Sequence, residues 1–233
     1  MNNDKWWSDP NMRIKWYGHA SFLIQTSGVR IITDPYTPSI VPFEPIREPA
    51  DIVIRSSDDD KGHNNAQMIP GNATVVTATE IIDDGLTLKE IRFDAVAVRE
   101  HNEHPTHKTP LDNAMYTIRS EELCVGHMGD VGHALTNEHI HALKDCDILL
   151  ALTGGFPTID LDDLDVAIEA IQPKVIIPMH YAVRHVDLGM LRIDAFTNRF
   201  PSDAVRSIDG NDIQITGENI DDLRRVIVLK PTC

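Results

Sequence analysis

Short segments rich in β-branched and aromatic residues, separated by turn-forming residues, dominate the first half of the chain. This pattern is typical of β-strands. We therefore expect strands at residues 13–16, 22–25, 29–33, 51–55, 74–77, 86–89, 91–98, 115–119 and 123–126. Five prolines from Pro35 to Pro49 predict an irregular connection, because proline suits neither a helix interior nor a central strand.

The second half changes to helices that alternate with short apolar strands. Thr136 can begin a helix that runs to Lys144. Asp160 can begin another, whose apolar residues recur every three or four positions: Leu161, Leu164, Ile168 and Ile171. Almost wholly apolar segments predict strands covered on both faces, at 148–152 and 174–179. A third helix is expected at 186–200, and two more strands at 204–208 and 226–229.

Composition and net charge restrict the number of domains and the classes of partner that we expect. No linker, low-complexity block or repeat divides the 233 residues, and 42% hydrophobic side chains suffice for a core, so we expect a single domain over 1–233. The formal net charge is −15, since 36 acidic residues outnumber 21 basic ones. A charge of this sign repels nucleic acids and anionic membranes, so neither is expected as a partner.

Other sequence features narrow the compartment and the cofactor. The first ten residues lack the basic and apolar runs of a targeting segment, and no stretch reaches the ~18 apolar residues that span a bilayer, so we expect a cytoplasmic protein. Cys124, Cys146 and Cys233 lie far apart in the sequence, which argues against a disulfide framework or a cysteine-rich zinc site. No glycine-rich phosphate loop supports a nucleotide cofactor.

Histidines and aspartates recur where predicted strands end. Six such clusters are present, at residues 18–19, 34–35, 58–63, 100–107, 127–130 and 179–181. Loops on a rigid sheet can bring imidazole and carboxylate ligands together around a metal ion. Taken singly, each residue could equally be a hydrogen-bonding side chain at a strand end. The metal-site prediction therefore rests on the number of such clusters.

Three motifs resemble a known family. Residues 16–22, with the Thr33-Asp34-Pro35 segment, look like the opening of the predicted metal-dependent hydrolases of the metallo-β-lactamase superfamily. Residues 126–133 resemble the central motif of that family, and 177–181 resemble its C-terminal ligand motif. The Thr153-Gly154-Gly155 segment also matches. The similarity covers about residues 13 to 182 and is greatest to the subgroup that contains L-ascorbate-6-phosphate lactonase.

The resemblance implies a four-layer αβ/βα sandwich with a one- or two-metal site at the sheet edge. It implies that Asp130 bridges the metals and that His180 is a terminal ligand. It places His19 and Asp34 beside the centre, where Asp34 would orient a ligand by binding its second nitrogen. His127 flanks the Asp130 turn and could either contact substrate or cap the loop.

The chain departs from the family after the strand at 51–55. The family has His-x-His-x-Asp-His there, whereas this chain has Asp58, Asp60, Gly62 and His63 at the corresponding positions. We prefer this register because it keeps three ligands: Asp58, Asp60 and His63. A slip of one residue would instead align Ser57, Asp59, Lys61 and Gly62. Carboxylates in place of imidazoles favour harder ions, such as manganese, magnesium or iron(II), over zinc.

This departure leaves open whether the site still binds metal or has lost it. The aspartate that helps to orient the nucleophilic water is missing in the preferred register, and Lys61 could neutralise a centre that binds no metal.

The next ligand region is ambiguous as well. His101 is the expected metal ligand, with Glu100 as the one-residue slip and His104 as a loop candidate.

These features predict a metal-dependent hydrolase of a small ester, lactone or phosphoester. One or two divalent ions (manganese, zinc or iron) would activate water, with His63 and Asp130 as the catalytic residues. A phosphorylated substrate would require cations near the site, and the candidates, which could equally be surface ion-pair partners, are Arg55, Arg99, Arg184 and His185. The alternative is a catalytically silent binding protein on the same fold. Related enzymes often form homo-oligomers, so self-association is a further expectation.

Overall fold

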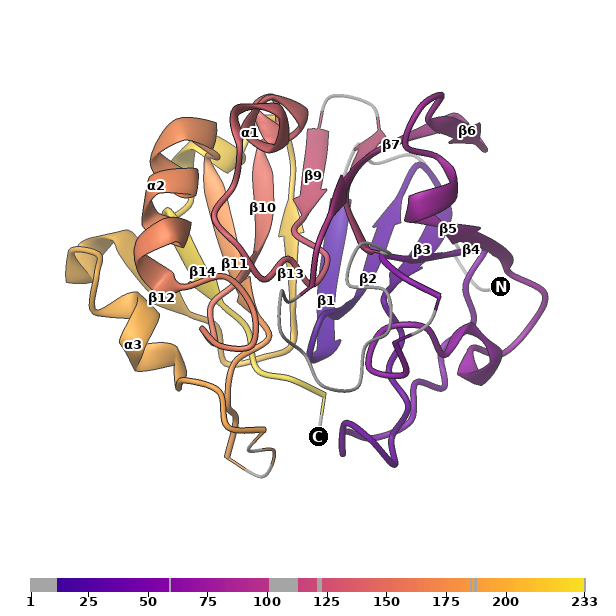
Figure 1. The fold of residues 1–233 in the computed structure, drawn as a ribbon, viewed down its shortest axis with the longest axis horizontal. Coiled ribbons are helices and arrows are strands. Elements are labelled where there is room, and N and C mark those ends of the chain that lie inside the picture. The colour runs from indigo at the N-terminus through magenta and orange to yellow at the C-terminus, as the bar shows by residue number, and fades with distance from the viewer. Residues whose placement is uncertain are drawn as a thin grey trace, which may run out of the picture.

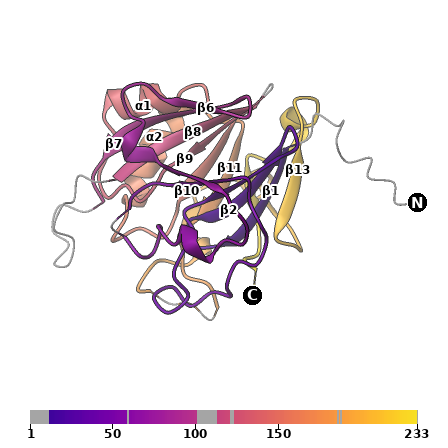
Figure 2. The same cartoon turned by 90° about the vertical axis from the view of Figure 1, so that its right-hand side faces the viewer.

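Two β-sheets lie face to face in the computed structural model of the chain (Figure 1). The structure describes residues 12–58, 60–100, 113–120, 123–184, 186 and 188–232. Helices lie on the outer side of one sheet, and loops on the outer side of the other (Figure 2). None of the described helices has the length and apolar character needed to span a membrane.

The first sheet has six strands, with β13 added from the C-terminal part of the chain. Its order is β13 (Asp212–Ile215), β1 (Met12–Gly18), β2 (Ser21–Thr26), β3 (Val29–Thr33), β4 (Ile52–Arg55) and β5 (Thr74–Thr77). The β1–β2–β3 segment pairs antiparallel, and β3, β4 and β5 run parallel. The carboxyl ends of β3 and β4 therefore lie at the same edge of the sheet.

The second sheet has eight strands. Its order is β12 (Val205–Ser207), β14 (Val226–Val228), β11 (Val175–Met179), β10 (Ile148–Leu152), β9 (Leu123–His127), β8 (Asn113–Ser120), β7 (Ile91–Val98) and β6 (Leu86–Leu88). Neighbours from β6 to β9 are antiparallel, and those from β9 to β12 are parallel. The carboxyl ends of β9, β10 and β11 share one edge.

Helices cover the outer face of the eight-stranded sheet. They are α1 (Asn137–Leu143), α2 (Leu161–Ile171) and α3 (Ile193–Thr197) (Figure 1). Thr136 caps α1 by accepting a hydrogen bond from the His139 backbone N–H. The predicted apolar stripe of α2 is buried. Short 3-10 helices complete the fold: η1 (Ala66–Met68), η2 (Ala78–Glu80), η3 (Ser202–Ala204) and η4 (Ile220–Asp222).

Alternation along the strands of the six-stranded sheet explains its two buried faces. In β1, Ile14 and Trp16 join the core between the sheets, whereas Tyr17 belongs to a second apolar cluster on the opposite face. Tyr36 and Phe43 from the proline-rich loop pack into that second cluster. The fold class is confirmed. Among the described residues, however, the proline-rich loop and η1 form the layer that covers the outer face of the six-stranded sheet.

Two local predictions were wrong or incomplete. The expected helix at 186–200 is reduced to α3, because Gly189 adopts a left-handed backbone and Leu191 donates its N–H to the Gly154 carbonyl instead of continuing a helix. Strand β13 was not predicted, since it is short and pairs with β1 from almost 200 residues away. Cys124 and Cys146, distant in sequence, lie with their sulfur atoms 3.4 Å apart as buried free thiols.

Candidate metal centre

The loops that follow several strands bring acidic and imidazole side chains to one cavity between the sheet edges. Their positions follow from the topology, because parallel neighbours deliver their carboxyl ends to the same edge. The polar side chains that line this cavity of about 190 Å³ are His19, Asp60, His63, Glu100, Asp130 and His180.

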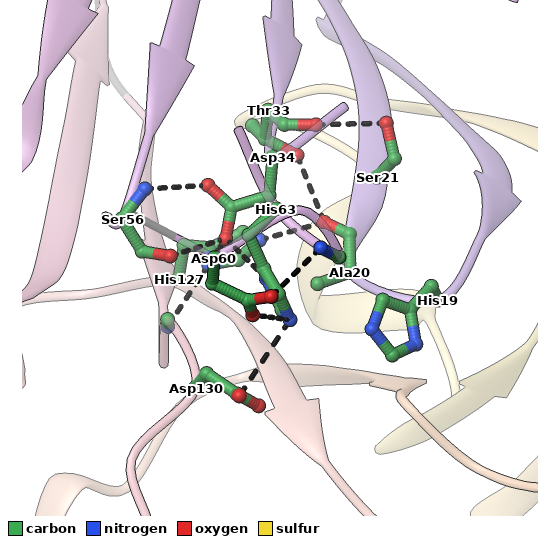
Figure 3. A network of polar contacts seen from close by, with 12 residues as sticks. His19, Ala20, Ser21, Thr33, Asp34, Ser56, Asp60, His63, His127 and Asp130 are labelled. Atoms are coloured by element: carbon green, nitrogen blue, oxygen red, sulfur yellow. Dashed lines mark hydrogen bonds and ion pairs between the residues drawn. The ribbon is translucent and has the colours of Figure 1, made fainter. Parts of the chain in front are cut away.

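Two overlapping groups of potential ligands share His63. Asp60, His63 and Asp130 form what we call the carboxylate group, and His19, His63 and His180 form the histidine group. Within each group the potential ligand atoms lie within 4.8 Å of one another. His63 Nε2 is 3.5 Å from Asp60 Oδ2 and 3.6 Å from Asp130 Oδ2 (Figure 3). Asp130 Oδ1 lies 3.3 Å from His180 Nε2, so Asp130 stands between two imidazoles.

Asp34 anchors His63. It is fully buried, and its Oδ2 accepts a 3.1 Å hydrogen bond from His63 Nδ1 (Figure 3). Ser56 donates to Asp34 through both its backbone N–H and its hydroxyl, each at 2.7 Å, and Tyr116 adds a third donor at 3.2 Å. Burial raises the pKa of Asp34, but His127, His63 and Ser56 together hold that pKa below its usual value. The ionised carboxylate keeps the proton of His63 on Nδ1 and leaves Nε2 facing the cavity.

His127 supports the loop that carries Asp130. Its Nδ1 accepts a hydrogen bond from the Gly129 backbone N–H at 3.0 Å, and its Nε2 donates to the Ala20 carbonyl at 2.9 Å. The ring is fully buried and stacks on Tyr116. Of the two roles left open by the sequence, this geometry matches loop capping, because both ring nitrogens are already engaged.

His19 lies inside the ligand cluster, whereas the sequence interpretation placed it beside the centre. Its ring centroid is 4.0 Å from that of His180 and 4.8 Å from that of His63. Burial, reinforced by these two imidazoles, holds the pKa of His19 well below its usual value. Burial likewise lowers the pKa of His180. Neutral imidazole is the form that binds metals, so both residues are suited to that role.

Several of these residues have backbone conformations that side chains disfavour. His19, Asp34 and His180 have φ angles of 51°, 37° and 54°. Such left-handed conformations cost about 1–3 kcal/mol each and persist where the surroundings enforce them. The His180 N–H donates to the His19 carbonyl at 3.1 Å, which ties the two strained turns together. A Cβ at Gly154 would lie only 2.1 Å from the His180 carbonyl oxygen, so this position requires glycine.

The altered first motif enters the site only in part. Asp60 and His63 line the cavity, but the Asp58 side chain is 58% exposed and lies 3.8 Å from Arg55, outside both ligand groups. Lys61 is exposed and does not line the cavity, although its carbonyl accepts a backbone hydrogen bond. Gly62 lines the cavity beside Asp60, whose Oδ1 accepts the Gly62 N–H at 2.8 Å. Asp59, His101, His104 and His185 lie outside the described residues.

Glu100 adds a carboxyl group that the sequence suggested only as an alternative to His101. It is 7% exposed and lines the cavity. Its Oε1 accepts a 2.9 Å hydrogen bond from Asn113, whose side-chain oxygen accepts the Asp130 backbone N–H at 3.2 Å. Burial, together with Asp130 and Asp60, raises the pKa of Glu100 to about 8. No sequence pattern indicates Asn113, because its role depends on the pairing of β7 with β8.

The donor set fits a divalent cation. His19 Nδ1, His180 Nδ1 and Asp130 Oδ1 are buried, and none has a hydrogen-bond partner among the described residues. Buried polar atoms are seldom left without partners, and three carboxyl groups around one cavity repel each other. A cation bound between these groups would relieve that repulsion and give Asp130 Oδ1 a partner. Imidazole nitrogens and carboxylate oxygens suit zinc, iron(II) and manganese, so the donors alone do not select one ion.

Comparisons with known proteins agree with this architecture. Residues 13–180 match the family described as Beta-lactamase superfamily domain. A UPF0173 protein of Pyrococcus abyssi is 33% identical over 187 residues, which cover 73% of this chain and 83% of that protein. A UPF0173 metal-dependent hydrolase of Caldivirga maquilingensis is 27% identical, with 72% of this chain and 81% of that protein covered.

A solved structure extends the similarity over nearly the whole chain. It is a Thermotoga maritima protein assigned as a zinc-dependent hydrolase of the metallo-β-lactamase superfamily, with a TM-score of 0.74 and 28% identity over 94% of this chain and 98% of that one. The family match spans the strands and loops that supply both ligand groups, from β1 to His180. The chain therefore belongs to the β-lactamase superfamily domain family.

Proposed function

We propose that this protein is a metal-dependent hydrolase of a small ester, lactone or phosphoester. The observation that carries the proposal is the convergence of the carboxylate and histidine groups on one cavity, with donor atoms buried and unpartnered among the described residues. The names of the Caldivirga and Thermotoga proteins, both metal-dependent or zinc-dependent hydrolases, support the same class of activity.

The two ligand groups would hold one or two divalent ions through Asp60, His63, Asp130, His180 and His19. When bound, a divalent ion would lower the pKa of a coordinated water and polarise the scissile group of the substrate. The presence of both carboxylates and imidazoles is compatible with manganese, iron(II) or zinc.

The chain's own residues position the reactants. Asp130 Oδ1, which faces His180 Nε2, would accept a hydrogen bond from the attacking water and orient it. Asp34 keeps His63 Nε2 directed into the cavity. Asn113 ties Glu100 to the backbone of the Asp130 turn and so fixes the separation of two carboxyl groups before substrate arrives.

The altered first motif favours a second candidate, a binding protein without catalysis. Gly62 occupies the position where the family has an aspartate, and Asp58 lies outside the ligand groups. The first change removes a carboxylate that the family has, and the second leaves the site without the expected ligand at position 58. Glu100 returns one carboxyl group to the cavity from the segment that follows β7, which is why we favour the hydrolase.

Metal removal and replacement test the choice between these functions. Protein stripped by a chelator should lose hydrolysis of 4-nitrophenyl esters, bis-(4-nitrophenyl) phosphate and simple lactones, and should regain it with manganese, iron(II) or zinc. Asp130→Asn should abolish the regained activity, because it removes a carboxylate oxygen from the ligand set. Asp203→Asn, an exposed change in η3, is the matched control and should retain the activity. Metal binding without turnover of any substrate class would contradict the hydrolase proposal.

A further inference from the structure

One wall of the cavity is apolar. It consists of Ile40, Val41, Pro157, Leu188 and Met190. Val41 and Met190 are buried, while Ile40 and Leu188 are 52% and 40% exposed at the mouth. Exposed apolar side chains grouped at the rim of a polar site indicate that an apolar part of a ligand covers them.

Backbone hydrogen bonds hold this wall at a fixed position relative to the ligand groups. The Ile40 and Val41 N–H groups both donate to the Thr37 carbonyl, and the Thr37 N–H donates to the Lys61 carbonyl beside Asp60. On the other side of the mouth, the Leu191 N–H donates to Gly154 at 2.7 Å, next to the turn that presents Pro157. Backbone hydrogen bonds therefore hold the apolar wall in place as part of the site.

Among the described residues that line the same cavity, none is an arginine or a lysine. Within the described residues that line it, the charged or titratable side chains are carboxyls and imidazoles. Arg99 and Arg184, candidates from the sequence, are exposed and do not line the cavity. Arg55 is directed to Thr77 at 3.0 Å and to Asp58 at 3.8 Å.

The charge balance points the same way. Asp60, Glu100 and Asp130 place three carboxyl groups around the cavity. Carboxylates repel a phosphate dianion, and this repulsion adds to the free-energy cost of placing it in the cavity. An uncharged ester meets no such repulsion when it binds.

We propose that the substrate is an uncharged ester or lactone with a short apolar acyl chain, rather than a phosphoester, and that the Ile40–Val41 and Leu188–Met190 segments bind this chain. The proposal rests on the hydrolase function proposed above. The cavity volume of about 190 Å³ is below the range typical of drug-sized ligands, so the acyl chain is short. The carbonyl would lie toward Asp130, and the chain toward Leu188.

Turnover of a graded ester series tests the substrate class. The metal-loaded protein is assayed with 4-nitrophenyl acetate, butanoate and hexanoate and with 4-nitrophenyl phosphate. We expect kcat/KM to rise a few-fold for each added pair of methylenes and to be at least about tenfold lower for the phosphate. Equal or faster turnover of the phosphate would overturn the proposal while leaving the hydrolase function intact.

Substitutions at the mouth locate the acyl site. Ile40→Ser and Leu188→Ser should each reduce the ratio of hexanoate to acetate turnover several-fold, since both remove apolar contact surface. Val166→Ser is the matched control, because Val166 is 64% exposed on α2 and does not line the cavity, so the ratio should stay unchanged. An unchanged ratio in both mouth variants would contradict the assignment of this wall.

Product binding separates this inference from the proposed function. Hexanoate and inorganic phosphate are titrated into the metal-loaded protein by calorimetry, which needs no turnover. We expect hexanoate to bind about tenfold more tightly than phosphate, and Ile40→Ser to weaken hexanoate only. Hexanoate binding without hydrolysis of any ester would contradict the hydrolase function but keep the ligand class. Tighter binding of phosphate would contradict the ligand class itself.

Discussion

The carboxylate group and the histidine group are held in different ways, although they share His63 and one cavity. In the carboxylate group, Asp34 fixes the His63 ring, and Asn113 binds the backbone of Asp130. In the histidine group, the Nδ1 atoms of His19 and His180 have no hydrogen-bond partner among the described residues, and both backbones are strained.

This difference indicates which half of the site is ordered before metal binds. Ligands whose second atoms are anchored lose little freedom on binding, so the carboxylate group should provide the higher affinity. The histidine group should depend more on the ion for its order, because the ion would supply contacts that the protein does not. The variants below test whether the carboxylate group binds metal more tightly than the histidine group, and they are given in order of decreasing expected effect.

Removal of His63 should have the largest effect, because it takes a ligand from both groups. We expect His63→Ala to lower metal affinity by about 100-fold or more, and His19→Ala, which affects the histidine group alone, by about tenfold. Titration calorimetry with zinc and manganese measures both. Equal losses in the two variants would contradict the sharing of His63 by both groups.

Weakening the anchor of His63 should come next. Asp34→Asn keeps the size of the side chain but loses the charge and one acceptor position for Ser56, Tyr116 and His63. We expect metal affinity to fall by about 10–100-fold, and the metal-free protein to lose about 3 kcal/mol of unfolding free energy. Denaturant unfolding gives the second value. Tyr116→Phe removes a single 3.2 Å hydrogen bond and should cost only about 1 kcal/mol.

Displacing His180 without removing a ligand should have an intermediate effect. Gly154→Ala places a methyl group against the His180 carbonyl, where the Cβ would be 2.1 Å away, so the turn must shift. We expect about 1–3 kcal/mol of destabilisation, with metal affinity reduced at the histidine group only. Gly189→Ala is the control, since nothing lies within 4 Å of its added Cβ and only the left-handed backbone opposes the change. Equal loss of metal affinity at both groups in Gly154→Ala would show that the groups are not independent.

The pH dependence of the metal-free protein should show the smallest effect. Glu100 has a pKa of about 8 in the folded protein, against an ordinary value of 4.5, so the folded state binds more protons between these values. Its contribution therefore makes stability fall as pH rises from about 4.5 to about 8. Glu100→Gln should be more stable than the wild type at pH 8, with a smaller difference at pH 5. Melting temperatures of chelator-treated protein check this, and a pH-independent difference would contradict the buried carboxyl at Glu100.

Sequence patterns predicted the sheet-rich fold because local signals determined most strands. Segments such as 29–33 and 148–152 are apolar and bounded by turn residues, and the structure has strands there. Strand β13 was missed because its partner β1 is distant in sequence. The 186–200 helix was overestimated because tertiary hydrogen bonding by Leu191 replaced a local preference.

The site was harder to predict than the fold. Asp58 and Asp60 both aligned with ligand positions of the family motif, yet Asp58 is exposed and Asp60 lines the cavity. A loop's direction depends on contacts such as the Gly62 N–H to Asp60 hydrogen bond, which no periodicity reveals. Asn113 was invisible for the same reason, since it acts through the register of β7 and β8.

Elemental analysis tests the central claim most directly. The protein is purified without chelator or affinity-tag metal and analysed after supply of manganese, iron(II) or zinc, with His63→Ala in parallel. We expect near-stoichiometric metal in the wild type with at least one of these ions, and its loss in His63→Ala. Absence of bound metal from the wild type under all three conditions would contradict the account and leave a binding protein on a hydrolase fold.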